Sequence, residues 1–195
     1  MDGWAENVRL SWDIHGDLTK VETGVTASAY EVQQQFVLPG MINLHSHAFQ
    51  RAMAGMSEIA GDGPDSFWTW RDLMYRYALH ITPQQMQAIA AQLYSECLRH
   101  GYTAVCEFHY LHRAQDGVFY PNMAETAEQV IAAANATGIG MSMLPVLYSH
   151  ADFNDQPLRT DQRRFSTKVE HILQLITQLE KSRSSQVEVD RKSVV

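Results

Sequence analysis

Strand patterns and helix patterns alternate along most of this chain, and that order restricts its fold more than any other feature. Apolar runs of strand length occupy three segments, 36–43, 102–109 and 139–148. Apolar residues at helical spacing, or a helix-start signal with a glycine stop, mark four segments, 67–77, 83–100, 122–136 and 165–179. Strands that alternate with helices in this way predict parallel strands joined by right-handed crossovers.

Two architectures fit this order, an open doubly wound sheet and part of a (β/α)8 barrel. Barrel enzymes place their chemistry at the carboxyl ends of the strands. Polar residues of this chain gather at those ends, and they are His45 and His47, then Glu107, His109 and Tyr110, then His150 and Asp152. We therefore expect an α/β fold, the N-terminal part of a (β/α)8 barrel.

The first residues show a different pattern, in which Val8, Leu10, Trp12 and Ile14 alternate with polar residues before the turn His15-Gly16-Asp17. Alternation followed by a turn is typical of a β-hairpin. We expect three parts: a small β-domain portion at 1–36, the first βα units of the barrel at 37–180, and a polar, divergent tail at 181–195 that does not continue into the next strand.

Charge and hydropathy limit the classes of partner. The net charge is −7 and no basic cluster occurs, which argues against nucleic acid or an anionic membrane as a partner. No apolar run approaches the roughly 20 residues that span a bilayer, and the start of the chain lacks a secretory signal. Cys97 and Cys106 show no metal or redox spacing. These features predict a cytoplasmic protein.

The triplet His45-Ser46-His47 ends the first predicted barrel strand. Side chains alternate along a strand, so both imidazoles point to one face and can reach a single divalent metal ion. Neutral imidazole suits zinc, and catalytic zinc sites usually take three protein ligands and a water. The alternative interpretation is a pair of structural histidines bonded to backbone carbonyls.

The segment from Val37 to His47, an apolar run followed by Pro-Gly and His-x-His, resembles the first-strand signature of the amidohydrolase superfamily. The segments 47–51, 67–71 and 107–110 together resemble the formimidoylglutamate deiminases of that superfamily, and the likeness covers most of residues 1 to about 180. It implies a distorted barrel, a small β-domain, one catalytic zinc ion and a homodimer. It also implies hydrolysis of N-formimidoyl-L-glutamate to N-formyl-L-glutamate and ammonia in histidine degradation.

By position in the resembling motifs, His45 and His47 correspond to zinc ligands, and Gln50, Arg71 and Tyr110 correspond to residues that hold the acidic small-molecule substrate. A forked guanidinium suits a carboxylate. Without the resemblance, Arg71 reads as an exposed helix charge, Tyr110 as a core tyrosine and Gln50 as a turn residue. Glu107 is a further candidate, as an acceptor for a ligand imidazole.

The other polar residues at the strand ends are weaker candidates for the site. His109 is expected to face the helices, and His112, His150 and Asp152 carry less weight than the residues named above.

The resemblance also implies groups that this sequence lacks. They are a further zinc ligand, a catalytic Glu and His, and a late aspartate, none of which has a counterpart here, so no catalytic residue is assigned. We expect a truncated chain that is inactive alone. The alternatives are another amidohydrolase acting as a deaminase or as a guanidine or purine hydrolase, and a non-catalytic fragment.

Overall fold

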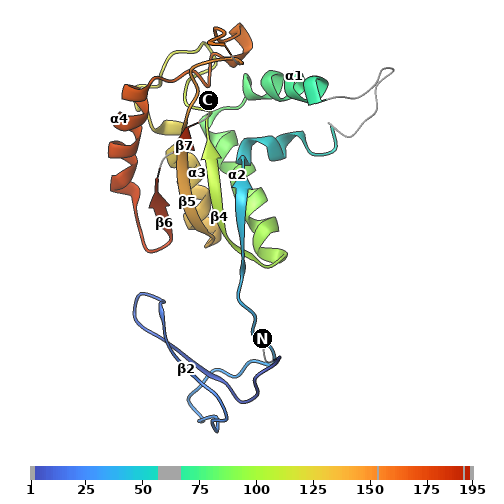
Figure 1. The fold of residues 1–195 in the computed structure, drawn as a ribbon, viewed down its shortest axis with the longest axis vertical. Helices are drawn as coiled ribbons and strands as arrows, with labels where there is room; N and C mark the ends of the chain where they lie inside the picture. The colour runs from blue at the N-terminus through green and yellow to red at the C-terminus, as the bar shows by residue number, and fades with distance from the viewer. Residues whose placement is uncertain (1–2, 57–66, 153, 191, 194–195) are drawn as a thin grey trace. The chain divides into compact units, whose positions relative to one another are not determined.

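Figure 1 shows a computed structural model of the chain, which describes residues 3–56, 67–152, 154–190 and 192–193. The chain forms two compact units, residues 1–39 and residues 40–195. The side chains of Phe67 and Trp68, which belong to one of the resembling motifs, lie outside the described part. Residues 191 and 194–195 of the predicted tail lie outside it as well.

The first unit contains the predicted hairpin, in which β1 (Arg9–Trp12) pairs antiparallel with β2 (Leu18–Glu22). The Asp13 carboxylate accepts hydrogen bonds from the backbone amides of His15 and Asp17 and so closes the turn. An ion pair between Arg9 and Glu31, 2.5 Å from Nε to Oε1, ties β1 to the segment that follows the hairpin. The hairpin prediction is confirmed.

The second unit is a parallel sheet with the strand order β3-β4-β5-β6, in which β7 also pairs with β5. Its elements are β3 (Met41–Ser46), η1 (Ala48–Met53), α1 (Phe67–Ala78), α2 (Pro83–Arg99), β4 (Tyr102–His109), α3 (Glu125–Thr137), β5 (Gly140–Leu147), η2 (Thr160–Gln162), α4 (Val169–Leu179), η3 (Glu180–Ser182), β6 (Val187–Val189) and β7 (Lys192–Ser193). In Figure 1, α2 and α3 lie behind the strands, and α4 lies beside β5 and β6.

Local sequence signals explain where these elements begin and end. Thr82 and Gln85 form a capping box at the start of α2, with each side chain bonded to the other residue's backbone amide. Gly138 ends α3 in the left-handed conformation. The core between helices and sheet is closed by apolar side chains that include Tyr94, Val105, Val130 and Met143.

The apolar run before the histidine pair predicts a buried strand, and this prediction is wrong. Ile42 and Leu44 of β3 are 59% and 69% exposed. Within the described residues β3 pairs with β4 alone, so it is an edge strand of the sheet. An apolar run predicts a strand but does not reveal how many neighbours that strand has, which is why the sequence misleads here.

The expectation that the chain enters no strand after Leu179 is also wrong. Residues Val187–Val189 form β6, which pairs in parallel with β5 from Met141 to Met143. Val187 is buried, and Val189 is half-buried. Two β-branched residues alternating with Glu188 are enough to extend a sheet whose edge is open, although the surrounding sequence is polar.

Gly40 lets the chain enter β3 beside the start of β4. A Cβ atom at this position would lie 2.1 Å from Thr103 Oγ1 and 2.7 Å from Thr103 Cβ. The next residue, Met41, donates its backbone amide to the carbonyl of Gly101 at 2.9 Å. Glycine is thus required at position 40 of the Pro-Gly step, because the chain passes close to Thr103 there.

We predict that Gly40→Ala lowers the free energy of unfolding by about 1–3 kcal/mol, because the added methyl group must displace Thr103. Urea denaturation followed by circular dichroism measures the loss. The double variant Gly40→Ala/Thr103→Ala should lose less than the single one, because it removes the two nearest Thr103 atoms. Equal midpoints for wild type and Gly40→Ala would contradict the close approach.

Candidate functional site

His45 and His47 lie at the carboxyl end of β3, as the strand periodicity predicts. Their ring centroids are 4.9 Å apart, with the rings nearly perpendicular. The ring of Phe108 packs against both, at 5.5 Å from His45 and 5.6 Å from His47. Phe108 follows the register partner of Ser46 in β4, so the pairing of β3 with β4 brings the three rings together.

His47 is oriented in a way that suits a metal ligand. Its Nδ1 lies 3.0 Å from the carbonyl oxygen of Phe108, which makes Nδ1–H the donor and leaves the lone pair of Nε2 available. Burial lowers the pKa of His47, and the neighbouring His45 lowers it further, so the neutral, metal-binding form is favoured. Together with the imidazole of His45, that of His47 fits one zinc ion as part of its ligand set.

The two histidines are not joined by further ligands in the described part of the chain. Among these residues, no group of three or more His, Cys, Asp or Glu side chains is arranged to hold a metal ion. Of the metal site that the sequence predicts, the described residues therefore bring together the two histidines His45 and His47.

Glu107 lies on the opposite side of the sheet from the rings and contacts the backbone that carries them. Its carboxylate accepts hydrogen bonds from Ser46 Oγ at 2.5 Å, the Ala48 amide at 2.6 Å and Tyr94 Oη at 3.1 Å. Burial raises its pKa, whereas these three donors lower it. The expectation that Glu107 accepts from a ligand imidazole is wrong, because its oxygens face Ser46 and α2.

Gln50 and Tyr110 meet beside the histidine pair. Gln50 Nε2 donates to Tyr110 Oη at 2.8 Å, and the ring of Tyr110 lies 5.0 Å from that of His47. Burial raises the pKa of Tyr110 well above its usual range, so its hydroxyl stays neutral and acts as a hydrogen-bonding group. The structure thus brings two of the three predicted substrate contacts next to the predicted ligands.

Arg71 joins this cluster through tyrosines. It is half-buried on α1, with Cζ 5.9 Å from the ring centroid of Tyr75, whereas Arg76 on the same helix is exposed. The hydroxyls of Tyr75 and Tyr148 lie 3.1 Å apart, and the ring of Tyr148 stacks on Tyr110 at 6.2 Å. Arg71 is therefore not the exposed helix charge of the alternative interpretation.

Sequence reasoning missed three residues of this cluster, Tyr75, Tyr148 and Gln162. Gln162 is buried and donates to Tyr75 Oη at 2.8 Å and to Tyr148 Oη at 3.1 Å. Tyr148 follows β5 directly, and its place after a strand could have marked it. Tyr75 and Gln162 carry no such signal, because their contact joins residues 87 positions apart.

The weaker candidates lie elsewhere. His109 faces the helices, as expected, with Nε2 3.1 Å from Thr126 Oγ1 on α3. His112 is buried, and its Nε2 lies 3.1 Å from the carbonyl oxygen of Val146. His150 and Asp152 are exposed. His109 and His112 pack against each other, with ring centroids 5.2 Å apart.

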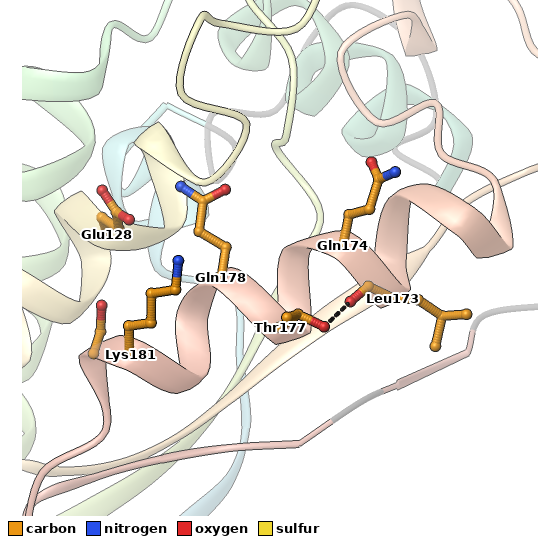
Figure 2. Close-up of a pocket in the computed structure, with 7 residues that line it drawn as sticks. Glu128, Leu173, Gln174, Thr177, Gln178 and Lys181 are labelled. Atoms are coloured by element: carbon orange, nitrogen blue, oxygen red, sulfur yellow. Dashed lines mark hydrogen bonds between the residues drawn. The ribbon is translucent and has the colours of Figure 1, made fainter.

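A surface groove is also separate from the histidine pair. A groove of about 540 Å³ runs along α4 and η3 beside α3 (Figure 2), and it is lined by Glu128, Leu173, Gln174, Thr177, Gln178, Lys181 and Ser182.

No helix in the described part of the chain is long and apolar enough to cross a membrane.

Comparison with known sequences gives a family and two relatives. The profile of the amidohydrolase family matches residues 36–190. Formimidoylglutamate deiminase of Pseudomonas aeruginosa is 51% identical over 178 residues, which are 91% of this chain and 39% of that protein. The 8-oxoguanine deaminase of the same organism is 25% identical over 85 residues, which are 44% of this chain and 18% of that protein. The chain thus spans about two fifths of the first relative.

Solved structures support the fold. An amidohydrolase from Brucella melitensis superimposes with a TM-score of 0.89 at 43% identity, over 97% of this chain and 43% of that one. Zinc-bound atrazine chlorohydrolase from Arthrobacter aurescens gives a TM-score of 0.69 at 17% identity, over 95% of this chain and 42% of that one, and shows the fold alone. The predicted fold class, the N-terminal portion of a barrel with a small hairpin, is confirmed.

The buried histidine His112 leads to a prediction about acid stability. Burial is the main cause that lowers its pKa from 6.5 to about 4. Between these values the unfolded chain binds a proton that the folded chain does not, so folded-state stability is complete above pH 6.5 and falls as the pH drops towards 4. The contribution of His112 to this loss is about 3 kcal/mol.

Urea denaturation at several pH values measures the effect against His112→Gln, which cannot take up the proton. The variant should be less stable at pH 7 and yet lose less stability than wild type between pH 6.5 and 4. Parallel pH profiles for the two proteins would show that His112 does not titrate on unfolding.

Proposed function

The chain belongs to the amidohydrolase family, and from this premise we propose that it forms the metal- and substrate-binding first part of a zinc-dependent formimidoylglutamate deiminase. The reaction would convert N-formimidoyl-L-glutamate and water to N-formyl-L-glutamate and ammonia. The observation that carries the proposal is the meeting of His45 and His47 with Gln50 and Tyr110 within one cluster, with Arg71 at its border.

Each side chain has a task in this proposal. His45 and His47 would hold zinc, which when bound polarises a water molecule for attack on the formimidoyl carbon. The half-buried guanidinium of Arg71 would take a carboxylate of the substrate through charge-assisted hydrogen bonds. The neutral groups of Gln50 and Tyr110, already 2.8 Å apart, would fix the polar part of the substrate between metal and guanidinium.

Hydrolysis needs more than these residues supply. A general base must take a proton from water, and a catalytic zinc site usually has three protein ligands. The described residues bring two histidines together, so we propose that the 195 residues alone bind metal weakly and do not turn over substrate. The complete enzyme would act in the cytoplasm as a homodimer in histidine catabolism, with no nucleic acid or membrane as partner.

Another amidohydrolase reaction is the second candidate. It rests on the 25% identity to 8-oxoguanine deaminase, which covers 44% of this chain. A purine would use the same zinc ligands but would offer Arg71 no carboxylate. The two substrates therefore distinguish the two candidates.

The direct test joins residues 1–180 of this chain to the remaining part of the P. aeruginosa formimidoylglutamate deiminase. This hybrid should release ammonia from N-formimidoyl-L-glutamate, and His45→Ala or His47→Ala should abolish the release together with zinc binding. The 195-residue chain alone serves as the second sample and should release none. Turnover of 8-oxoguanine, with none of formimidoylglutamate, would replace the first candidate by the second.

We predict that Arg71→Ala in the hybrid raises KM for formimidoylglutamate by about 10- to 100-fold, because a charge-assisted bidentate contact of about 1.5–3 kcal/mol is lost. Steady-state ammonia release measures this change. Arg76→Ala is the matched control, since Arg76 lies on α1 but is exposed, and its KM should equal that of the unsubstituted hybrid. The same KM for both variants would remove Arg71 from the substrate site.

A further inference from the structure

Glu107 is a fully buried carboxylate whose contacts are concentrated on the segment that carries the two histidines. It is the register partner of Ser46, and its side chain points towards α2, where Tyr94 donates to it. Burying a carboxylate is costly unless charge-assisted hydrogen bonds offset the loss of water. Two of the three bonds that do so come from Ser46, between the histidines, and Ala48, directly after them.

The bond to Ala48 also serves as a helix cap. The turn η1 begins at Ala48, and its N-cap residue, His47, makes no side-chain capping bond. The first amides of a helical turn have no partner within the turn, so another group must accept from them. Glu107 Oε1 accepts from the Ala48 amide, which leaves the imidazole of His47 available to point towards the site.

The next residue of β4 holds the same histidines from the other side of the sheet. The carbonyl oxygen of Phe108 lies 3.0 Å from His47 Nδ1, and its ring packs on both imidazoles. Two consecutive residues of β4 therefore contact the end of β3 from its two faces. Glu107 bonds Ser46 and the Ala48 amide, and Phe108 packs its ring on the two imidazoles.

We propose that Glu107 is the positioning residue of the histidine pair: its buried carboxylate fixes Ser46 and the Ala48 amide so that the imidazoles of His45 and His47 converge on one metal ion. The inference rests on the proposed function for the role of the pair as a metal site. The position of the His47 ring can be measured without metal, so the two claims are separable.

The test compares the metal-free 195-residue chain with Glu107→Gln and Ser46→Ala, using nitrogen NMR of labelled histidine rings. Wild-type His47 should show the Nδ1–H tautomer that its bond to Phe108 imposes. Glu107→Gln should move His47 towards a mixture of tautomers, because glutamine keeps one acceptor oxygen and its amide nitrogen cannot accept the second of the two bonds that Ser46 and Ala48 donate. Ser46→Ala should produce a smaller change, and it decides the question if Glu107→Gln does not fold.

Thr126→Val is the control for general destabilisation, since it removes a buried hydroxyl that bonds His109 and the Leu111 carbonyl and neither histidine of the pair. It should lower thermal stability and leave His47 unchanged. Wild-type ring signals for His47 in both Glu107→Gln and Ser46→Ala would overturn the positioning role, as would an equal change in Thr126→Val.

Zinc titration of the hybrid protein and its variants against a chromophoric chelator supplies the second readout. Glu107→Gln should bind zinc about 10- to 100-fold more weakly than wild type, and Thr126→Val should keep the wild-type affinity. Equal zinc affinity in Glu107→Gln and wild type would overturn the proposal. Absence of zinc binding by the wild-type hybrid would instead contradict the proposed function, and the ring signals would still decide the role of Glu107.

Discussion

The parallel pairing of β3 with β4 is the constraint on which the rest of the site depends. It sets Ser46 opposite Glu107 and thereby places a buried carboxylate beneath the histidine pair and an aromatic ring above it. Gly40 allows the two strands to begin side by side, because any Cβ there would collide with Thr103. The geometry of the two histidines therefore depends on β4 as much as on their own strand.

From this pairing the polar cluster extends along the carboxyl ends of the strands. Tyr110 follows β4 and Tyr148 follows β5, and their stacked rings connect the histidine pair with Tyr75 and Arg71 on α1. The histidine pair and the Arg71 guanidinium thus lie at the two sides of one aromatic cluster. Such an arrangement suits a small substrate that carries both a hydrolysable group and a carboxylate.

Much of this could be predicted from the sequence, because strands and helices here follow local signals. The strand at 102–109 and the capping box at Thr82 needed only periodicity and composition. The exposure of Leu44 and the strand at Val187 could not be predicted, since both depend on which strand edges remain open. The contacts of Glu107 with Ser46 and Ala48, and that of Gln162 with Tyr75, were equally hidden, because these residues lie 61, 59 and 87 positions apart in sequence.

We propose that His45 and His47 jointly bind one metal ion, with His47 using Nε2 because its Nδ1 bonds the carbonyl oxygen of Phe108. Anomalous diffraction from crystals of the zinc-loaded hybrid protein tests this metal binding. We expect a single zinc peak bonded to the imidazoles of both His45 and His47, through Nε2 in the case of His47. A zinc peak bonded to Nδ1 of His47, or one that involves neither histidine, would contradict it.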